Sequence, residues 1–583
     1  MTNWQQVYET WDNFAPLDSD LRDELEGIKA DPEKLEDAFY KELSFGTGGM
    51  RGVIGVGTNR MNIYTVRKAV DGLARHLRDA TEKAEERGVA ISYDCRYMSK
   101  EFALEAAKVL GSYGIRSYIF DTLHPTPLLS FAVRYLQTAA GIMITASHNP
   151  PEYNGLKVYN EDGGQIVPKE ADKIVARIQE VENELTVPVM TQEDLTKHDL
   201  LHWIGAEVDH AYLQQLLRLS RMSKTELEKE KDLPVVFTPL HGTSAELVMR
   251  GLEQLHFSNV HIVEEQAMPD PEFSTVASPN PEEHEAFTMA IEKGNALGAE
   301  ILLGTDPDSD RLGVAAKNSA GEYQVLTGNQ LGSLFIDYIL SHAPADQLNQ
   351  GRVLKTIVTT ELGRAIADSY GVQTVDTLTG FKYIGEKIHE YETSGENFLF
   401  GFEESYGYLI SDIVRDKDAV QAAVMAAEMA YYWRKQGKTL FDALDDLYQK
   451  YGYYLEGMSS MTLKGKEGSK KIALMMDTLR EKGMAEIAGV NVLSIEDYLQ
   501  SRSFSLIDGK EKAILLPKEN VLKFILENDN WVCLRPSGTE PKIKCYFGVC
   551  ESNRRASEEK LTRLKTAMEK TMSEIVTGTD LVK

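Results

Sequence analysis

Cysteine is scarce in this 583-residue chain: there are four, and no two of them form a CxxC pair. So few cysteines in a long chain argue against a disulfide framework, and Cys533, Cys545 and Cys550 are expected in strand cores rather than at a metal. The sequence also lacks any run of about 18 apolar residues, and its opening MTNWQQVYETWDNF has neither the basic nor the apolar region of a signal peptide. We therefore expect no membrane partner and a cytoplasmic location.

Positive charge is in short supply as well. The 63 Lys and Arg residues are outnumbered by 90 Asp and Glu residues, which gives a formal net charge of −27. This balance argues against a broad surface for nucleic acid or for an anionic membrane. It leaves room for a small anionic substrate, because a few Lys and Arg side chains can converge locally.

Strand-like and helix-like segments alternate along most of the chain, a pattern that predicts parallel α/β layers. The order strand, helix, strand, helix, strand, polar loop occurs three times, starting near residues 89, 233 and 352, and predicts an internal structural repeat. Residues 454–574 differ and predict an α+β domain with antiparallel strands. The predicted domains are 1–200, 201–322, 323–452 and 453–583, and the charged run 224–232 is expected to be a solvated helix end.

The first polar loop, TASHNPP, follows the apolar run AGIMIT and contains Ser147 and His148. Two prolines block any continuation of the strand, so the serine is held at a constrained strand exit. Ser, His and Asn also form ordinary turns, and the flanking glycines of a hydrolase nucleophile elbow are missing. Alone, the loop fits a turn, a nucleophile or a phosphate carrier.

The second loop, GTDPDSDRLG, places Asp306, Asp308 and Asp310 on alternate positions of a proline-stiffened segment. Three adjacent carboxylates repel one another unless a cation neutralises them, and all-oxygen ligands suit Mg²⁺. An EF-hand is excluded because its sixth and twelfth positions hold Arg311 and Lys317 in place of Gly and Glu. The alternative is an acidic surface turn.

The third and fourth loops carry groups that suit a sugar and a phosphate. Glu403 and Ser405 in GFEESYGY follow an apolar strand, where they can bond hydroxyl groups or simply cap the strand. RPSGTEPKIK offers a guanidinium fork, two hydroxyls and close backbone N–H groups, which suit a phosphate or a polar hairpin.

Together, and in this order, the four loops resemble the T-A-S-H-N-P, G-x-D-x-D-x-D-R, G-[EF]-E-x-S and R-P-S-G-T-E-P motifs of the α-D-phosphohexomutase superfamily, the phosphoglucomutase/phosphomannomutase family. The resemblance spans about residues 40 to 570, and the entry LSFGTGGMRG looks most like the subgroup of bacterial phosphoglucomutases and phosphopentomutases. It implies four domains around a central cleft, three of them similar α/β domains and the last an α+β domain related to the TATA-box-binding fold.

The resemblance also implies roles for individual residues. Ser147 corresponds to the family's phosphoserine and would bind one Mg²⁺ together with Asp306, Asp308 and Asp310. His148, Lys157 and Arg51 correspond to catalytic positions. The implied substrate-binding residues are Arg311, Thr379, Gly380, Glu403, Ser405, Lys417, Arg535, Ser537, Gly538 and Thr539. From the residues alone, His148 also fits a bond to the loop backbone, and Lys417 also fits an ion pair with Asp416 or Asp418.

The implied reaction interconverts α-D-glucose 1-phosphate and glucose 6-phosphate through glucose 1,6-bisphosphate. Phosphomannomutase and phosphopentomutase activities fit the same loops, because the sugar loop does not distinguish the sugars. A phosphoserine-dependent sugar phosphatase and a non-catalytic sugar-phosphate regulator are further alternatives; four enclosing loops favour transfer over hydrolysis. The expected partners are small sugar phosphates, and the chain is expected to be a monomer or a homodimer.

Overall fold

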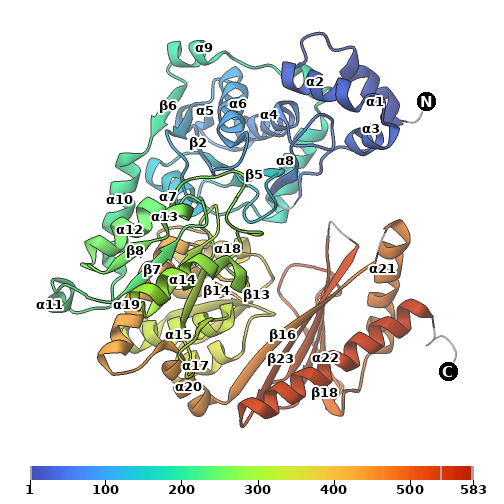
Figure 1. Cartoon of the computed structure of the whole chain (residues 1–583). Helices are drawn as coiled ribbons and strands as arrows, with labels where there is room; N and C mark the ends of the chain where they lie inside the picture. Colours follow the sequence, from blue (N-terminus) through green and yellow to red (C-terminus); the bar gives the residue numbers. More distant parts are fainter. Residues whose placement is uncertain (1–2, 47, 464, 539–540, 579–583) are drawn as a thin grey trace. The chain divides into compact units, whose positions relative to one another are not determined.

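The computed structural model describes residues 3–46, 48–463, 465–538 and 541–578. These residues form two compact units, a first unit of residues 1–328 and 381–439 and a second unit of residues 329–380 and 440–583. The chain begins with three short helices, α1 (Asn3–Asp12), α2 (Ser19–Ile28) and α3 (Pro32–Phe39). The three helices lie side by side (Figure 1). Their apolar faces meet around the fully buried Trp11, whose ring packs edge-on against Phe39 and Tyr64.

The first repeat is built on a six-stranded sheet of order β1-β5-β4-β2-β3-β6. Strand β2 pairs in parallel with both β3 and β4, as the alternating pattern predicts, and β4 then turns back into the antiparallel β5. Its elements are β1 (Gly49–Val53), α4 (Ile63–Ala80), α5 (Ala84–Arg87), β2 (Val89–Tyr93), α6 (Ser99–Ser112), β3 (Ser117–Phe120), α7 (Thr126–Leu136), β4 (Ala140–Ile144), β5 (Tyr153–Tyr159), α8 (Pro168–Gln179), α9 (Gln192–Lys197) and β6 (Leu201–Ile204).

The second repeat has the same plan in a five-stranded sheet of order β11-β10-β9-β7-β8. Strand β7 lies in parallel between β8 and β9, as β2 lies between β3 and β4, and β9 turns back into the antiparallel β10. Its elements are α10 (Ala206–Leu216), α11 (Lys224–Leu227), β7 (Val235–Thr238), α12 (Ala245–Gln254), β8 (Val260–Ile262), α13 (Glu264–Ala267), α14 (Thr288–Leu297), β9 (Ile301–Thr305), β10 (Leu312–Lys317) and β11 (Tyr323–Val325). The predicted internal repeat is thus confirmed for these two segments.

The third repeat is divided between the two units. In the second unit, β12 pairs in parallel with β13; in the first unit, β14 turns back into the antiparallel β15. Its elements are α15 (Gly328–His342), α16 (Ala345–Asn349), β12 (Gly351–Thr356), α17 (Leu362–Ser369), β13 (Gln373–Thr377), α18 (Phe381–Ser394), β14 (Asn397–Glu403), β15 (Gly407–Leu409), α19 (Ala419–Lys435) and α20 (Leu440–Tyr451). In each repeat, therefore, the polar loop predicted from the sequence joins the third strand to an antiparallel fourth.

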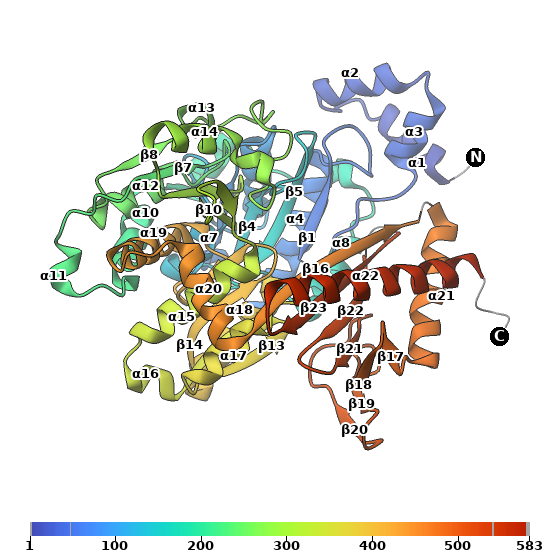
Figure 2. The same ribbon diagram turned by 60° about the horizontal axis from the view of Figure 1, so that its bottom comes forward.

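The C-terminal part is the predicted α+β domain. Its antiparallel sheet has the order β16-β23-β22-β21-β18-β19-β20, with β17 paired to β18, and α22 packs across β16 and β23 (Figures 1 and 2). Cys533 and Cys545 lie in the core of this sheet, as expected, and Cys550 is half-buried. The elements are β16 (Tyr453–Thr462), α21 (Gly465–Lys482), β17 (Glu486–Ile487), β18 (Val490–Asp497), β19 (Arg502–Ser505), β20 (Glu511–Ala513), β21 (Leu522–Leu526), β22 (Trp531–Pro536), β23 (Lys542–Glu551) and α22 (Arg554–Thr577).

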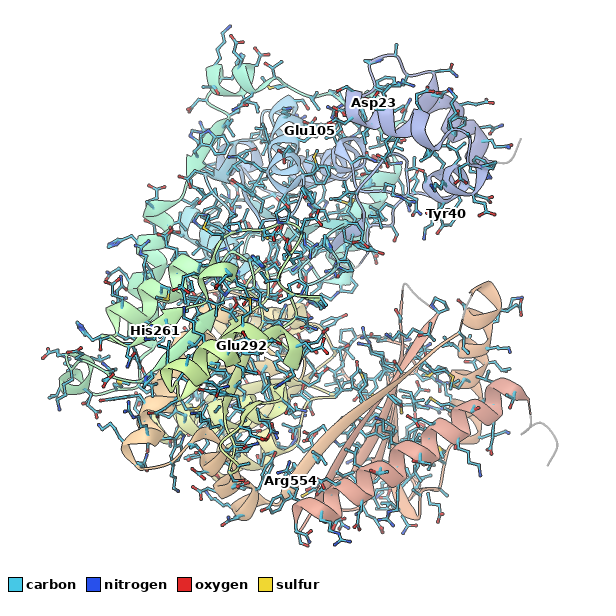
Figure 3. All side chains as sticks on the ribbon, viewed as in Figure 1. Asp23, Tyr40, Glu105, His261, Glu292 and Arg554 are labelled. Carbon is cyan, nitrogen blue, oxygen red and sulfur yellow. The ribbon has the colours of Figure 1, made fainter. Side chains whose placement is uncertain are left out.

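Asp23, Glu292 and Arg554, which are labelled in Figure 3, are exposed charged residues. The prediction that the charged run 224–232 is a solvated helix end was wrong in one respect: Lys231 is fully buried. Its ammonium group donates to the carbonyl oxygens of Leu227, Lys229 and Leu255, which satisfy the buried charge. Among the described residues, no helix is both long and apolar enough to cross a membrane.

Candidate active site

Ser147 lies just beyond β4, where the strand ends, and its side chain points toward the acidic loop. The hydroxyl donates to Oδ2 of Asp306 over 2.9 Å and lies 3.2 Å from Nδ1 of His148. The residue is 4% exposed and has a φ of +53°, a left-handed conformation that costs energy for any residue with a side chain. The Ser147 hydroxyl is thus held in a strained backbone conformation beside a carboxylate that is distant in sequence.

Asp306, Asp308 and Asp310 occupy the turn between β9 and β10 and are all buried. One ligand oxygen from each lies within 4.8 Å of the others. Among the residues that the structure describes, Oδ1 of Asp308 and Oδ1 of Asp310 are buried without a hydrogen-bond donor. Buried carboxylate oxygens that converge without donors are what a hard divalent cation requires, so the donor set fits such an ion.

Ionisation of the three carboxyl groups is uneven. Burial raises the pKa of Asp306 well above its usual value, and the charges of Asp310 and Asp308 raise it further. Burial also opposes the ionisation of Asp308, yet the Lys157 ammonium 2.7 Å away holds the pKa of Asp308 well below its usual range. A bound divalent cation would favour the charged form of all three carboxyls.

Two lysines reach the acidic loop from different repeats. Lys157 on β5 lies 2.7 Å from Asp308 and 3.4 Å from Asp310, and Lys417 lies 3.2 Å from Asp310 and 3.1 Å from Asp416. Burial lowers the pKa of each amine, but the facing carboxylates outweigh it, so both pKa values are raised and both amines carry a proton. Lys417 thus makes one of the two ion pairs considered as the alternative to substrate binding, the one with Asp416, and also contacts the acidic loop.

Glycine is required where the Lys417 side chain crosses β15. A Cβ atom at Gly407 would lie 2.2 Å from Cδ of Lys417. A similar demand holds at Gly242, where a Cβ atom would lie 2.5 Å from the backbone of Pro307 in the acidic loop. Both glycines therefore allow a close approach that positions charged groups of the site.

His148 is expected to remain neutral over the physiological range. Burial, followed by the positive charge of Arg311, lowers the pKa of His148 to about 3. We predict that ¹³C-histidine NMR of the unphosphorylated, metal-free protein will show no titration of the His148 imidazole between about pH 5.5 and 8, whereas an unperturbed histidine titrates near 6.5. The signal is assigned by its absence from His148→Gln, and a midpoint near 6.5 for that signal would contradict this prediction.

The two arginines predicted at the site lie at its edge. Arg51 on β1 donates from Nη1 to Oδ1 of Asn149 over 2.7 Å, which places it against the serine loop. Arg311 forms an ion pair with Glu282, and its Nε lies 3.9 Å from Asp310. The structure therefore brings both guanidinium groups to the loops around Ser147 and the aspartates.

The predicted sugar loop follows β14 in the first unit. Glu403 ends the strand and is buried, and Ser405 lies in the turn that leads into β15. The backbone N–H of Leu312 on β10 donates to the carbonyl of Tyr406 over 3.0 Å, so this loop is tied to the strand that follows the aspartates.

The remaining predicted residues belong to the second unit. Thr379 and Gly380 follow β13, and Gly380 has a φ of +110°. Arg535 on β22 donates from Nε to Glu519 over 2.8 Å, and the Ser537 N–H donates to the carbonyl of Lys542 over 2.7 Å. A Cβ atom added at Gly538 would meet no other described atom within 4 Å. Thr539 lies outside the described residues.

Several residues that hold the site in place were not predicted from the sequence. Thr126, which begins α7, donates its hydroxyl to Asp308 Oδ2 over 3.0 Å, and Thr243 donates its hydroxyl to the carbonyl of Pro307 over 3.0 Å. Tyr159 donates to Asp416 over 2.8 Å, next to Lys417. A threonine at a helix start and a tyrosine on a strand are ordinary in sequence, so only the fold reveals these contacts.

Comparison with known proteins agrees with the geometry. Family models of the phosphoglucomutase/phosphomannomutase domains match four successive segments: α/β/α domain I at residues 42–185, domain II at 210–321, domain III at 327–451 and the C-terminal domain at 480–565. The four-domain architecture expected from the sequence, with three α/β domains and a different C-terminal domain, is thereby confirmed. The exact domain boundaries stay a prediction.

Individual proteins are similar over most of the chain. A phosphoglucomutase of Staphylococcus haemolyticus is 40% identical over 89% of this chain and 92% of its own length, and one of Staphylococcus aureus (strain bovine RF122 / ET3-1) is 41% identical over 88% and 90%. Among solved structures, parafusin, a phosphoglucomutase from Paramecium, superposes with a TM-score of 0.67 at 17% identity over 92% of this chain and 96% of its own. A phosphoglucomutase/phosphomannomutase family protein from Burkholderia thailandensis gives 0.65 at 19% identity over 90% and 97%. These two structures share the fold.

Proposed function

The chain belongs to the phosphoglucomutase/phosphomannomutase family, and from that premise we propose that it is a phosphoglucomutase that interconverts α-D-glucose 1-phosphate and glucose 6-phosphate. The observation that carries the proposal is the 2.9 Å contact between the Ser147 hydroxyl and Asp306, within a buried group of three carboxylates. It supports the assignment of Ser147 as a phosphate carrier beside a cation site, in a chain whose relatives at 40% identity are phosphoglucomutases.

In the proposed reaction, phosphorylated Ser147 gives its phosphoryl group to the free hydroxyl of the sugar phosphate. The bond from phosphorus to Ser147 Oγ breaks as the sugar oxygen bonds to phosphorus, and the proton of the sugar hydroxyl passes to the serine oxygen that is released. The resulting glucose 1,6-bisphosphate rotates by about half a turn within the site and returns its other phosphoryl group to Ser147. The serine is therefore regenerated as a phosphoserine in every cycle.

The side chains around Ser147 have distinct parts in this proposal. Neutral His148, with Nδ1 3.2 Å from the serine hydroxyl, is placed to take the serine proton when Ser147 is rephosphorylated. Lys157, next to Asp308, stays protonated. It can therefore supply positive charge to the transferring phosphoryl group and act as a proton donor. Arg51 and Arg311 supply positive charge beside the same loops.

We assign the metal to Asp306, Asp308, Asp310 and Ser147, with one Mg²⁺ per chain. When bound, this ion would neutralise the charge that develops on the phosphoryl oxygens during transfer. Lys157 and Lys417 hold the carboxylates in place through the ion pairs described above, and Thr126 fixes the orientation of Asp308.

Recognition of the substrate is assigned to the loops that the family resemblance singles out. Glu403 and Ser405 bind the sugar hydroxyls, and Lys417, Arg311, Thr379 and Gly380 complete the contacts to the substrate. Arg535, Ser537, Gly538 and Thr539 bind the phosphate that is not being transferred, since an arginine fork beside hydroxyls and backbone N–H groups recognises phosphate well. The cytoplasmic location and the state of monomer or homodimer stay predictions.

The test compares kcat/KM for glucose 1-phosphate, mannose 1-phosphate and ribose 1-phosphate with the purified protein, Mg²⁺ and a trace of the matching bisphosphate. We expect glucose 1-phosphate to give the highest kcat/KM, with glucose 6-phosphate as product. Highest kcat/KM for the mannose or ribose ester would replace the proposal with a phosphomannomutase or a phosphopentomutase. Release of free phosphate in place of an isomerised ester would make the chain a phosphatase.

A further inference from the structure

Arg96 has an unusual position beneath the serine loop. It follows β2, its side chain is fully buried, and its guanidinium group donates to four backbone carbonyls of one loop. Nη1 donates to Pro150 over 2.8 Å and to Tyr153 over 3.0 Å, and Nη2 donates to Ser147 and Asn149.

The guanidinium group is itself held from two sides. Its Nε lies 3.4 Å from Oδ2 of Asp94, and its central carbon lies 5.0 Å from the ring centroid of Phe273. Asp94 is further fixed by the Ser99 hydroxyl over 2.7 Å. Phe273 belongs to the second repeat, so the arginine links the serine loop to the repeat that carries the aspartates.

We propose that Arg96 is a positioning residue for phosphoryl transfer, a deepening of the proposed function that rests on Ser147 being the phosphate carrier. A non-glycine residue avoids a φ of +53° unless its surroundings enforce it, and here a planar fork of N–H groups fixes the carbonyl of Ser147 and those that follow. These hydrogen bonds from Arg96 fix the direction of the Ser147 hydroxyl, which points toward Asp306. Lysine cannot replace Arg96, because an ammonium group has three N–H donors on one nitrogen and cannot donate to four carbonyls at once.

This role predicts a change in where the phosphoryl group goes. Transfer to the sugar requires the serine phosphate and the sugar hydroxyl to be aligned, whereas hydrolysis uses a mobile water, whose oxygen bonds to phosphorus as the bond to Ser147 Oγ breaks and whose proton passes to the serine oxygen. A loosened loop therefore slows transfer to sugar much more than hydrolysis. Loss of the hydrogen bonds from Arg96 should lower kcat and raise the fraction of phosphoenzyme that is hydrolysed, with KM unchanged.

The experiment uses the full chain loaded at Ser147 with ³²P from labelled glucose 1,6-bisphosphate. Quench-flow then measures loss of label with and without glucose 6-phosphate in wild type, Arg96→Lys, Arg96→Met and Phe273→Leu. Arg87→Met is the matched control, because Arg87 in the same repeat also donates to two backbone carbonyls, those of Gln137 and Thr138, which lie before the start of β4, whereas the serine loop follows its end.

We expect transfer to the sugar to slow about 10²-fold in Arg96→Met and Arg96→Lys, and about tenfold in Phe273→Leu, while hydrolysis changes little. Arg87→Met should match wild type in both rates. If the Arg96 variants lose thermal stability but keep the wild-type ratio of transfer to hydrolysis, the inference is overturned; if they do not fold, Phe273→Leu decides it by the same ratio. If wild type takes up no label at Ser147, the proposed function fails instead.

Discussion

Ser147→Ala is expected to abolish mutase activity, with a loss of about 10⁴-fold or more, because the variant has no oxygen to carry the phosphoryl group between the two sugar positions. It should also take up no ³²P from labelled glucose 1,6-bisphosphate. The side chain is small, and among the described residues its hydroxyl bonds only Asp306 and His148, both in loops of the site, so the fold should persist. Coupled assay of glucose 6-phosphate formation and filter binding of labelled protein measure the two effects.

A matched control for this substitution is Ser112→Ala. The Ser112 hydroxyl donates to the Val109 carbonyl within α6 and has no contact with the acidic loop. This variant should keep wild-type labelling and activity. Retention of full activity by Ser147→Ala would refute the carrier assignment, whatever the control shows.

Asp308→Asn is expected to lower kcat by about 10²- to 10³-fold and to weaken the binding of Mg²⁺, because it removes one of three converging negative charges from the cation site. Lys157 would keep Asp310, 3.4 Å away, as its remaining carboxylate, so the buried ammonium is not left without a counter-charge. Titration of activity with Mg²⁺, together with thermal unfolding with and without the ion, separates weaker metal binding from loss of fold.

Asp199→Asn serves as the control for charge, because the Asp199 side chain is 77% exposed and lies outside the acidic loop. It removes the same unit of charge from the protein and should leave the Mg²⁺ titration unchanged. An Asp308→Asn variant with a wild-type Mg²⁺ titration would show that the three carboxylates do not hold the catalytic ion.

The sequence predicted the strands, the repeat and the four polar loops, because these depend on local patterns. Apolar runs that end in Pro or Gly mark strand exits, and alternating aspartates mark a cation site. Placing Ser147 beside Asp306 required the fold as well: the two lie on equivalent loops of two repeats, each between the third strand and its antiparallel partner.

The supporting contacts could not be predicted, because they depend on tertiary structure and leave no pattern in the sequence. Arg96 binds backbone carbonyls, which every residue has, and Thr126 and Tyr159 meet their carboxylates only after the repeats pack together. The same limit explains Lys231, which sits in a charged run yet is buried because three carbonyl oxygens happen to converge on its amine.

In the proposed function, Ser147 alone carries the phosphoryl group between enzyme and sugar. Peptide mass spectrometry of the purified protein tests it after incubation with glucose 1,6-bisphosphate and Mg²⁺, and again after addition of excess glucose 1-phosphate. The proposal predicts one phosphoryl group on Ser147 that disappears when the sugar ester is added, with glucose 1,6-bisphosphate formed in its place. A phosphoryl group on another residue, or a phosphorylated Ser147 that glucose 1-phosphate does not discharge, would contradict it.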